Sequence, residues 1–74
     1  MRYKGYELMP VSYQEEGSNE WRAKINILRI DAGINQDINY PFTIETETFK
    51  TEEEANGIII LLGKQKIDND ELGT

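Results

Sequence analysis

The chain lacks cysteine and histidine altogether. Without cysteine it can form neither disulfides nor thiolate metal sites, and without histidine it lacks the commonest metal ligand and the commonest general base. A cysteine-free chain fits the reducing cytosol, so we expect a cytoplasmic location. A domain of 74 residues has a small core, and without disulfides such a domain gains stability from a partner or a second copy.

Long apolar runs are also absent. The longest is Ile58 to Leu62, whereas a membrane-spanning helix needs about 20 apolar residues. The first residues do not resemble the apolar core of a signal peptide. We therefore expect a soluble protein with no membrane contact, built as one domain over residues 1–67 with a flexible acidic tail over residues 68–74.

Positive charge is scarce, and it is unevenly distributed. The net charge is −6; residues 1–30 carry a net +1 and residues 31–74 a net −7. A negative surface repels nucleic-acid phosphates, so the charge disfavours binding to DNA or RNA. A local basic patch on the N-terminal hairpin remains open as an alternative.

Period-two alternation predicts three strands. Tyr6 to Tyr13 alternates with one phase change, which predicts an edge strand with a bulge at Met9-Pro10 that brings Val11 and Tyr13 to the core side. Residues 14–20 have the composition of a hairpin loop. Trp21 to Ile30 gives the cleanest alternation. Residues 31–41 read as a long loop, and residues 42–49 as a threonine-rich third strand.

A helix is expected after Thr51, which can cap the first turn, with Glu54 three residues later. Ala55, Ile58, Ile59 and Leu62 then share one helical face. Gly63 is the expected helix end, and residues 64–67 an extended return. The alternative is a buried strand over Ile58 to Leu62, although a cap and an acidic first turn have no role in a strand.

These elements predict an α+β domain, a three-stranded antiparallel meander (β-β-β-α) with one C-terminal helix packed on one face of the sheet. The outward face of that sheet is the candidate interaction face. Its residues are Glu7, Arg22, Lys24, Glu45 and Glu47. The alternative interpretation is that these charged residues pair with opposite charges on adjacent strands and only fix the register of the sheet.

The chain offers little for catalysis or metal binding. The loop with Asp31 and Asp37 lacks the residue order of a calcium loop, and no phosphate-binding glycine motif occurs. Ser12 and Ser18 have no histidine to activate them. We expect no catalytic residue, no cofactor and no metal. The aromatic residues Trp21, Tyr13 and Phe42 fall in phase with the isoleucines, so we expect them in the core.

Four segments give the chain a family resemblance: Tyr6 to Pro10, Trp21-Arg22-Ala23, the helix start from Phe49 to Ala55, and Gly63-Lys64-Gln65-Lys66-Ile67-Asp68. The pattern resembles small uncharacterised bacterial proteins, which implies a strand-strand-strand-helix fold and no assigned activity. The T-x-E-E-A helix start also resembles HicB-type antitoxin domains. The proline- and glycine-rich segment that precedes the helix in those domains is absent here.

Two hypotheses follow. The first is a non-enzymatic protein–protein interaction module, which binds an unknown protein or a second copy through the open sheet face or a sheet edge. The second is a nucleic-acid-binding regulator that uses Arg22, Lys24 and Arg29. A small enzyme or metal-binding protein is a third alternative with little support in the sequence.

Overall fold

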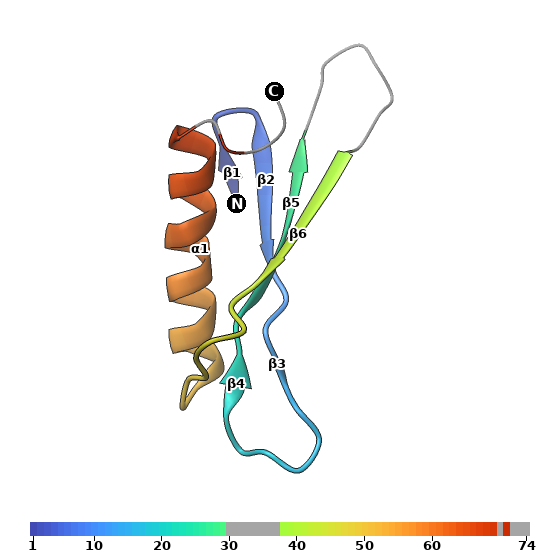
Figure 1. Cartoon of the computed structure of the whole chain (residues 1–74). Helices are drawn as coiled ribbons and strands as arrows, with labels where there is room; N and C mark the ends of the chain where they lie inside the picture. Colours follow the sequence, from blue (N-terminus) through green and yellow to red (C-terminus); the bar gives the residue numbers. More distant parts are fainter. Residues whose placement is uncertain (30–37, 70, 72–74) are drawn as a thin grey trace.

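The computed structural model describes residues 1–29, 38–69 and 71, which form six strands and one helix (Figure 1). In chain order the elements are β1 (Arg2–Tyr3), β2 (Tyr6–Pro10), β3 (Tyr13–Gln14), β4 (Trp21–Arg22), β5 (Lys24–Arg29), β6 (Ile38–Thr43) and α1 (Glu52–Asp68). Four strands form an antiparallel sheet in the order β1-β2-β5-β6, and β3 pairs with β4.

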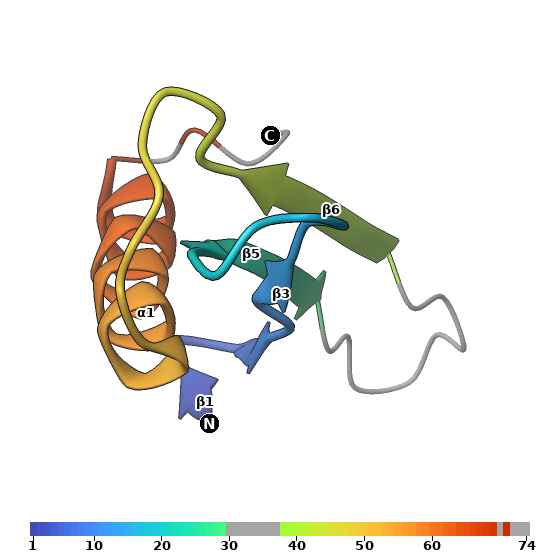
Figure 2. The ribbon, with the colours of Figure 1, turned by 90° about the horizontal axis from the view of Figure 1, so that it is seen from below.

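The helix α1 packs on one side of the sheet, chiefly against β5 and β2 (Figure 2). The predicted α+β class, with an antiparallel sheet and one C-terminal helix, is confirmed. The predicted number of three strands is wrong, because the short strands β1, β3 and β4 add to the three main ones. The described residues contain no helix that is long and apolar enough to cross a membrane.

The first strand pair turns at Lys4 and Gly5, both with positive φ (49° and 85°). Tyr3 faces Tyr6 across this two-residue turn, as in a type I′ hairpin. Lysine is atypical at such a position, so the sequence did not predict the turn. As a result β1 covers part of β2, and β2 is not the edge strand that we predicted.

The predicted bulge at Met9-Pro10 is wrong. Leu8 faces Ile27 in β2–β5 and Tyr13 faces Arg22 in β3–β4, so both pairs share one register and no residue is inserted between them. The alternation therefore continues unbroken, and it exposes Val11 and Tyr13 (39% and 41%). Ser12 takes the core-side position, and its hydroxyl accepts a hydrogen bond from the amide of Lys24 at 3.4 Å.

The third strand is shifted from its predicted range of residues 42–49. It begins at Ile38, within the predicted loop, and ends at Thr43; the predicted loop otherwise lies outside the described residues. The ladder continues only at two points beyond Thr43. The amide of Ile44 donates to the carbonyl of Ala23 at 3.0 Å, and Trp21 and Phe49 exchange hydrogen bonds of 2.6 and 2.8 Å. Residues 45–48 leave the ladder between these points.

The core lies between α1 and the β2–β5 pair. Its fully buried side chains come from both layers: Leu8, Ala23, Ile25, Ile27, Ala55 and Ile59. Trp21 and Phe42 pack against this cluster as predicted, whereas Tyr13 does not.

The predicted helix is confirmed, and the alternative strand over Ile58 to Leu62 is wrong. Thr51 is the N-cap, and its hydroxyl accepts from the amide of Glu54 at 3.1 Å. Gly63 does not end the helix but lies inside it, facing the sheet. A Cβ at Gly63 would stand 3.3 Å from Cδ1 of Ile25 and 3.5 Å from Cδ2 of Leu8. The predicted extended return is accordingly helical, and α1 ends at Asp68.

Both prolines face away from β5 at the margins of the sheet. In an antiparallel pair the backbone N–H and C=O groups of successive residues point alternately toward and away from the partner strand. The amide of Val11 donates to the carbonyl of Lys24 in β5, so the backbone groups of the preceding Pro10 point away from β5. The amide of Ile44 likewise donates to Ala23, so those of Pro41, three residues earlier, also point away from β5. Proline has no N–H to offer an incoming strand. The part of β2 that β1 leaves uncovered and the outer margin of β6 are therefore poor templates for strand addition.

Candidate functional site

The helix carries more large apolar side chains than the sheet covers. Its buried stripe is Ala55, Ile59 and Gly63, in which two small residues let the helix axis approach β5 closely. Ile58, predicted to face the core, is 40% exposed, and Leu61 is 57% exposed. These two side chains, three positions apart on the helix, form an exposed apolar pair. Contiguous apolar patches on a surface are candidate binding sites.

Two open grooves flank these side chains. The first, of about 630 Å³, lies between α1 and the chain that follows β6; the second, of about 460 Å³, lies beside the N-terminal half of α1. Ile58 and Leu61 line both grooves and so form a ridge between them. We call this combined region the α1 surface. Its residues are Phe42, Thr43, Ile44, Glu45, Thr46, Glu47, Phe49, Glu53, Glu54, Gly57, Ile58, Leu61, Leu62 and Gln65.

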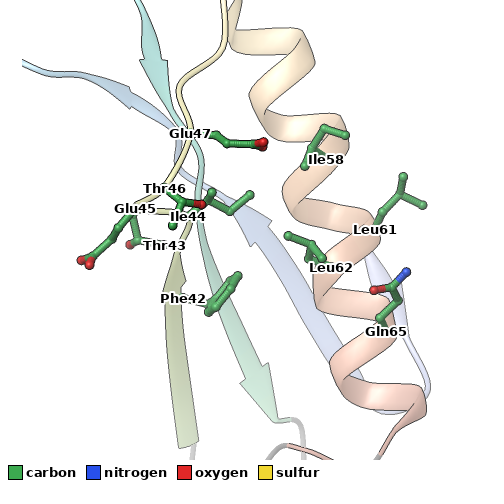
Figure 3. A pocket seen from close by; sticks show the side chains of 10 residues that line it. All are labelled: Phe42, Thr43, Ile44, Glu45, Thr46, Glu47, Ile58, Leu61, Leu62 and Gln65. Carbon is green, nitrogen blue, oxygen red and sulfur yellow. The ribbon is translucent and has the colours of Figure 1, made fainter.

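Arg22 fixes the wall of the first groove. Its Nη1 donates to the carbonyl oxygens of Ile44, Glu45 and Glu47 at 3.3, 2.8 and 3.3 Å. Its Nε donates to Oε1 of Glu15 at 2.9 Å, and only 16% of the side chain is exposed. These bonds hold the segment that leaves the ladder at residues 45–48. Figure 3 shows Ile44 and Glu47 directed toward α1, and Glu45 directed away from it.

The rim of the α1 surface is acidic. Four glutamates line it, and its lining contains no lysine and no arginine: Glu45, Glu47, Glu53 and Glu54. In the part of the chain that the structure describes, no three carboxylates stand close enough together to hold a metal ion. The α1 surface thus combines an apolar centre with a negative border.

The structure does not gather the predicted interaction face into a charge ladder. Glu7 lies opposite Arg2 and Leu28, and its carboxylate stands 3.3 Å from the amino group of Met1. Lys24 lies opposite Thr43.

The remaining members of the predicted face meet through the main chain. Arg22 reaches Glu45 and Glu47 at their carbonyl oxygens, so it binds neither carboxylate. The Glu47 side chain is directed toward α1 and that of Glu45 away from it (Figure 3). The expected ladder assumed that residues 42–49 form a regular strand, and that strand ends at Thr43.

The three basic residues of the nucleic-acid hypothesis do not share a face. Arg22 and Lys24 alternate with the buried Ala23 and Ile25, and so lie on the side away from α1. Arg29 is in phase with Ile25, on the side of α1. With the Arg22 guanidinium already bonded within the chain, these side chains do not form one basic patch.

The C-terminal end of α1 is tied to the β1–β2 turn. The Tyr3 hydroxyl donates to the Asp68 carboxylate at 2.9 Å, and Nζ of Lys4 donates to it at 2.6 Å. Hydrogen bonds from Lys4 and Tyr3 lower the pKa of Asp68, and the same carboxylate raises the pKa of Lys4 and of Tyr3. The two ends of the domain are thereby held together.

The sequence pointed to part of this site. A run of five apolar residues on a helix turns through more than one full turn, so not all of them can face a single sheet. The length of the run could therefore have indicated that one of its residues, such as Leu61, is exposed. The exposure of Ile58 was not predictable, because it depends on the helix rotating toward its small residues Ala55 and Gly63.

Comparison with known proteins gives no match: no family model, no curated protein and no solved structure matches the chain. The resemblance to small bacterial proteins and to HicB-type domains therefore stays a prediction.

Proposed function

We propose that the protein is a small, non-enzymatic protein–protein interaction module that binds its partner through the α1 surface. The observation that carries this proposal is the exposed pair Ile58 and Leu61, which stands between two grooves on a helix whose opposite face is fully packed. Apolar side chains of this size in a groove are typical anchors for another protein.

Two other surfaces support binding less well. The face of the sheet away from α1 also exposes apolar side chains, namely those of Met9, Val11 and Tyr13 (42%, 39% and 41%). They stand among polar and charged residues such as Lys24 and Asn26, as on the solvated face of an antiparallel sheet, and none of them lines either groove. Strand addition at the uncovered part of β2 and at β6 is opposed by Pro10 and Pro41, and the edge strand β1 has only two residues. The α1 surface is thus the best candidate.

The non-enzymatic part of the proposal rests on the shape and chemistry of the grooves. They are open and lined largely by aliphatic and aromatic side chains, with carboxylates at the border. A catalytic site instead needs a nucleophile, a base or a cofactor held in an enclosed geometry. The cytoplasmic location is part of the same proposal and rests on the absence of cysteine.

Affinity capture from extract of the source cell tests the proposal. The wild-type chain is compared with the double variant Ile58→Gln/Leu61→Gln and with the matched control Met9→Gln/Val11→Gln, which replaces exposed apolar residues elsewhere. We expect a protein that is retained by the wild type and the control and lost by the first variant. Equal retention by all three chains would remove the α1 surface from the proposal.

A further inference from the structure

We infer that the α1 surface receives a cationic amphipathic helix of a different protein. This inference rests on the proposed binding role and names the chemistry of the partner. It follows from two features of the surface: its apolar ridge and its acidic border.

The apolar part fits a helix. Ile58 and Leu61 are separated by three positions on α1, and the grooves on either side of them run beside the helix. Large side chains at positions i, i+3, i+4 and i+7 of a partner helix enter such grooves as ridges enter grooves in ordinary helix packing. Gly57 leaves room for them, since nothing lies within 4 Å of the place where its Cβ would stand.

A glycine at this position has a cost that the fold does not offset. Gly57 lies in the middle of α1 and is exposed, where glycine destabilises a helix by about 1 kcal/mol relative to alanine. It makes no close approach to another element, in contrast to Gly63. A binding role for the second groove explains the glycine, because a side chain at position 57 would occupy the space that a partner enters.

The border supplies the charge preference. Glu47 stands on one side of the ridge, with the Glu45 side chain turned outward behind it, and Glu53 and Glu54 line the groove on the other side. Lysine or arginine residues that flank the apolar stripe of a partner helix would face these carboxylates. Exposed charges of this kind contribute mainly to association rate and to partner choice. The net charge of −6 adds long-range attraction for a basic partner.

The same charges argue against a second copy as the occupant. A two-fold contact places identical surfaces against each other, so it would bring the border carboxylates of Glu47, Glu53 and Glu54 close to those of the second copy. Among the described residues, the grooves are lined by no lysine or arginine. A cation does stand nearby, because Nζ of Lys66 lies 4.2 Å from the ring centre of Phe42, and it is outnumbered by these carboxylates. A heterologous, basic partner avoids this repulsion.

The test uses the full chain and synthetic peptides. The probe is a fluorescent helical peptide of about 18 residues, a length at which isolated helices form, with leucine at i, i+3, i+4 and i+7 and lysine on both flanks. A matched peptide carries glutamate in place of lysine, and a third carries glutamine. Fluorescence anisotropy gives each Kd at low and at moderate salt.

We expect the lysine peptide to bind about tenfold more tightly than the glutamine peptide, and the glutamate peptide to bind least. Leu61→Gln should weaken binding of the lysine peptide about tenfold, whereas Met9→Gln should leave it unchanged. Gly57→Gln should fill the second groove and weaken binding while raising the unfolding temperature, which separates lost binding from lost folding.

Three outcomes would overturn the inference. Equal binding of the lysine and glutamine peptides would remove the charge preference. Undiminished binding of the lysine peptide to Leu61→Gln would show attraction to the acidic chain in general rather than to this surface. A dimer in light scattering that Leu61→Gln dissociates would make a second copy the occupant. The affinity capture described above tests the binding surface itself, so failure of the proposed function is distinguishable from failure of this partner assignment.

Discussion

Arg22 and Glu45 are joined through the main chain rather than through their charges. Nη1 of Arg22 donates to the carbonyl oxygen of Glu45 at 2.8 Å, and it reaches the carbonyls of Ile44 and Glu47 at 3.3 Å. One side chain thus satisfies three carbonyls of a segment that has left the sheet. The consequence is an ordered groove wall in which Arg22 binds neither the Glu45 nor the Glu47 carboxylate.

Arg22→Lys should destabilise the domain by about 1–3 kcal/mol, because one ammonium cannot reproduce this set of charged hydrogen bonds. Amide hydrogen exchange should increase within residues 44–48. The control is Glu15→Gln, which removes the exposed ion-pair partner of Arg22 but keeps the carbonyl contacts, and it should cost less than about 1 kcal/mol. Urea unfolding measures both. Equal losses in the two variants would contradict the role of the carbonyl contacts.

The two helix glycines should respond in opposite directions to substitution. Gly57→Ala should stabilise the domain by about 1 kcal/mol, because the site is open and alanine favours the helix. Gly63→Val should destabilise it by about 1–3 kcal/mol, because the added atoms would press on Ile25 and Leu8. Thermal unfolding followed by circular dichroism compares them. A stabilising Gly63→Val would show that the helix and sheet do not approach as closely as described.

Replacing an exposed apolar residue of α1 should change the free energy of unfolding far less than replacing a buried one. Leu61→Gln should change the free energy of unfolding by less than about 0.5 kcal/mol, since more than half of the side chain is in water. Ile59→Ala should cost about 2–5 kcal/mol, because Ile59 is fully buried. Chemical denaturation gives both values. A large loss in Leu61→Gln would mean that this residue serves the fold and not a partner.

Because Asp68 contacts Lys4 and Tyr3, the stability of the fold should depend on pH in the acidic range. Since the pKa of Asp68 is lower in the folded chain, the contact stabilises the fold above the ordinary aspartate pKa of about 3.9, and the effect is lost as pH falls through the lower folded value.

Asp68→Asn should therefore lower the unfolding temperature at neutral pH and cease to differ from wild type in strong acid. Because the pKa of Lys4 is raised, the wild-type advantage should also shrink above about pH 10.4, where lysine ordinarily loses its proton. Thermal scans between these limits measure the difference. A difference that is the same at every pH would contradict the ionic contact.

Local signals in the sequence predicted the elements better than their contacts. The alternation from Trp21 onward and the Thr51 cap each depend on neighbouring residues, and both predictions were confirmed. The end of the third strand depends on Arg22, which lies about 20 residues away and stabilises an irregular segment by tertiary hydrogen bonds. Gly63 resembles a helix end in sequence, yet it serves close packing against Ile25. Neither role has a local signature.

The candidate site was harder to predict for a related reason. The helix faces the sheet with its small residues, so the position of Ile58 depends on how closely α1 approaches β5. The charged residues were noted in the sequence, but their pairing was predicted from a regular strand. Because that strand ends at Thr43, Glu45 and Glu47 line a groove and do not pair with charged residues across neighbouring strands.

The positions of Pro10 and Pro41 affect how the chain behaves when it is crowded. Fibrils grow when each new molecule finds an uninterrupted row of amide donors along a free strand. Here β1 is only two residues long, and a residue without an amide hydrogen interrupts both the part of β2 beyond it and the outer row of β6. These interruptions lower the tendency of the chain to stack through its sheet at high concentration, even though α1 exposes apolar side chains.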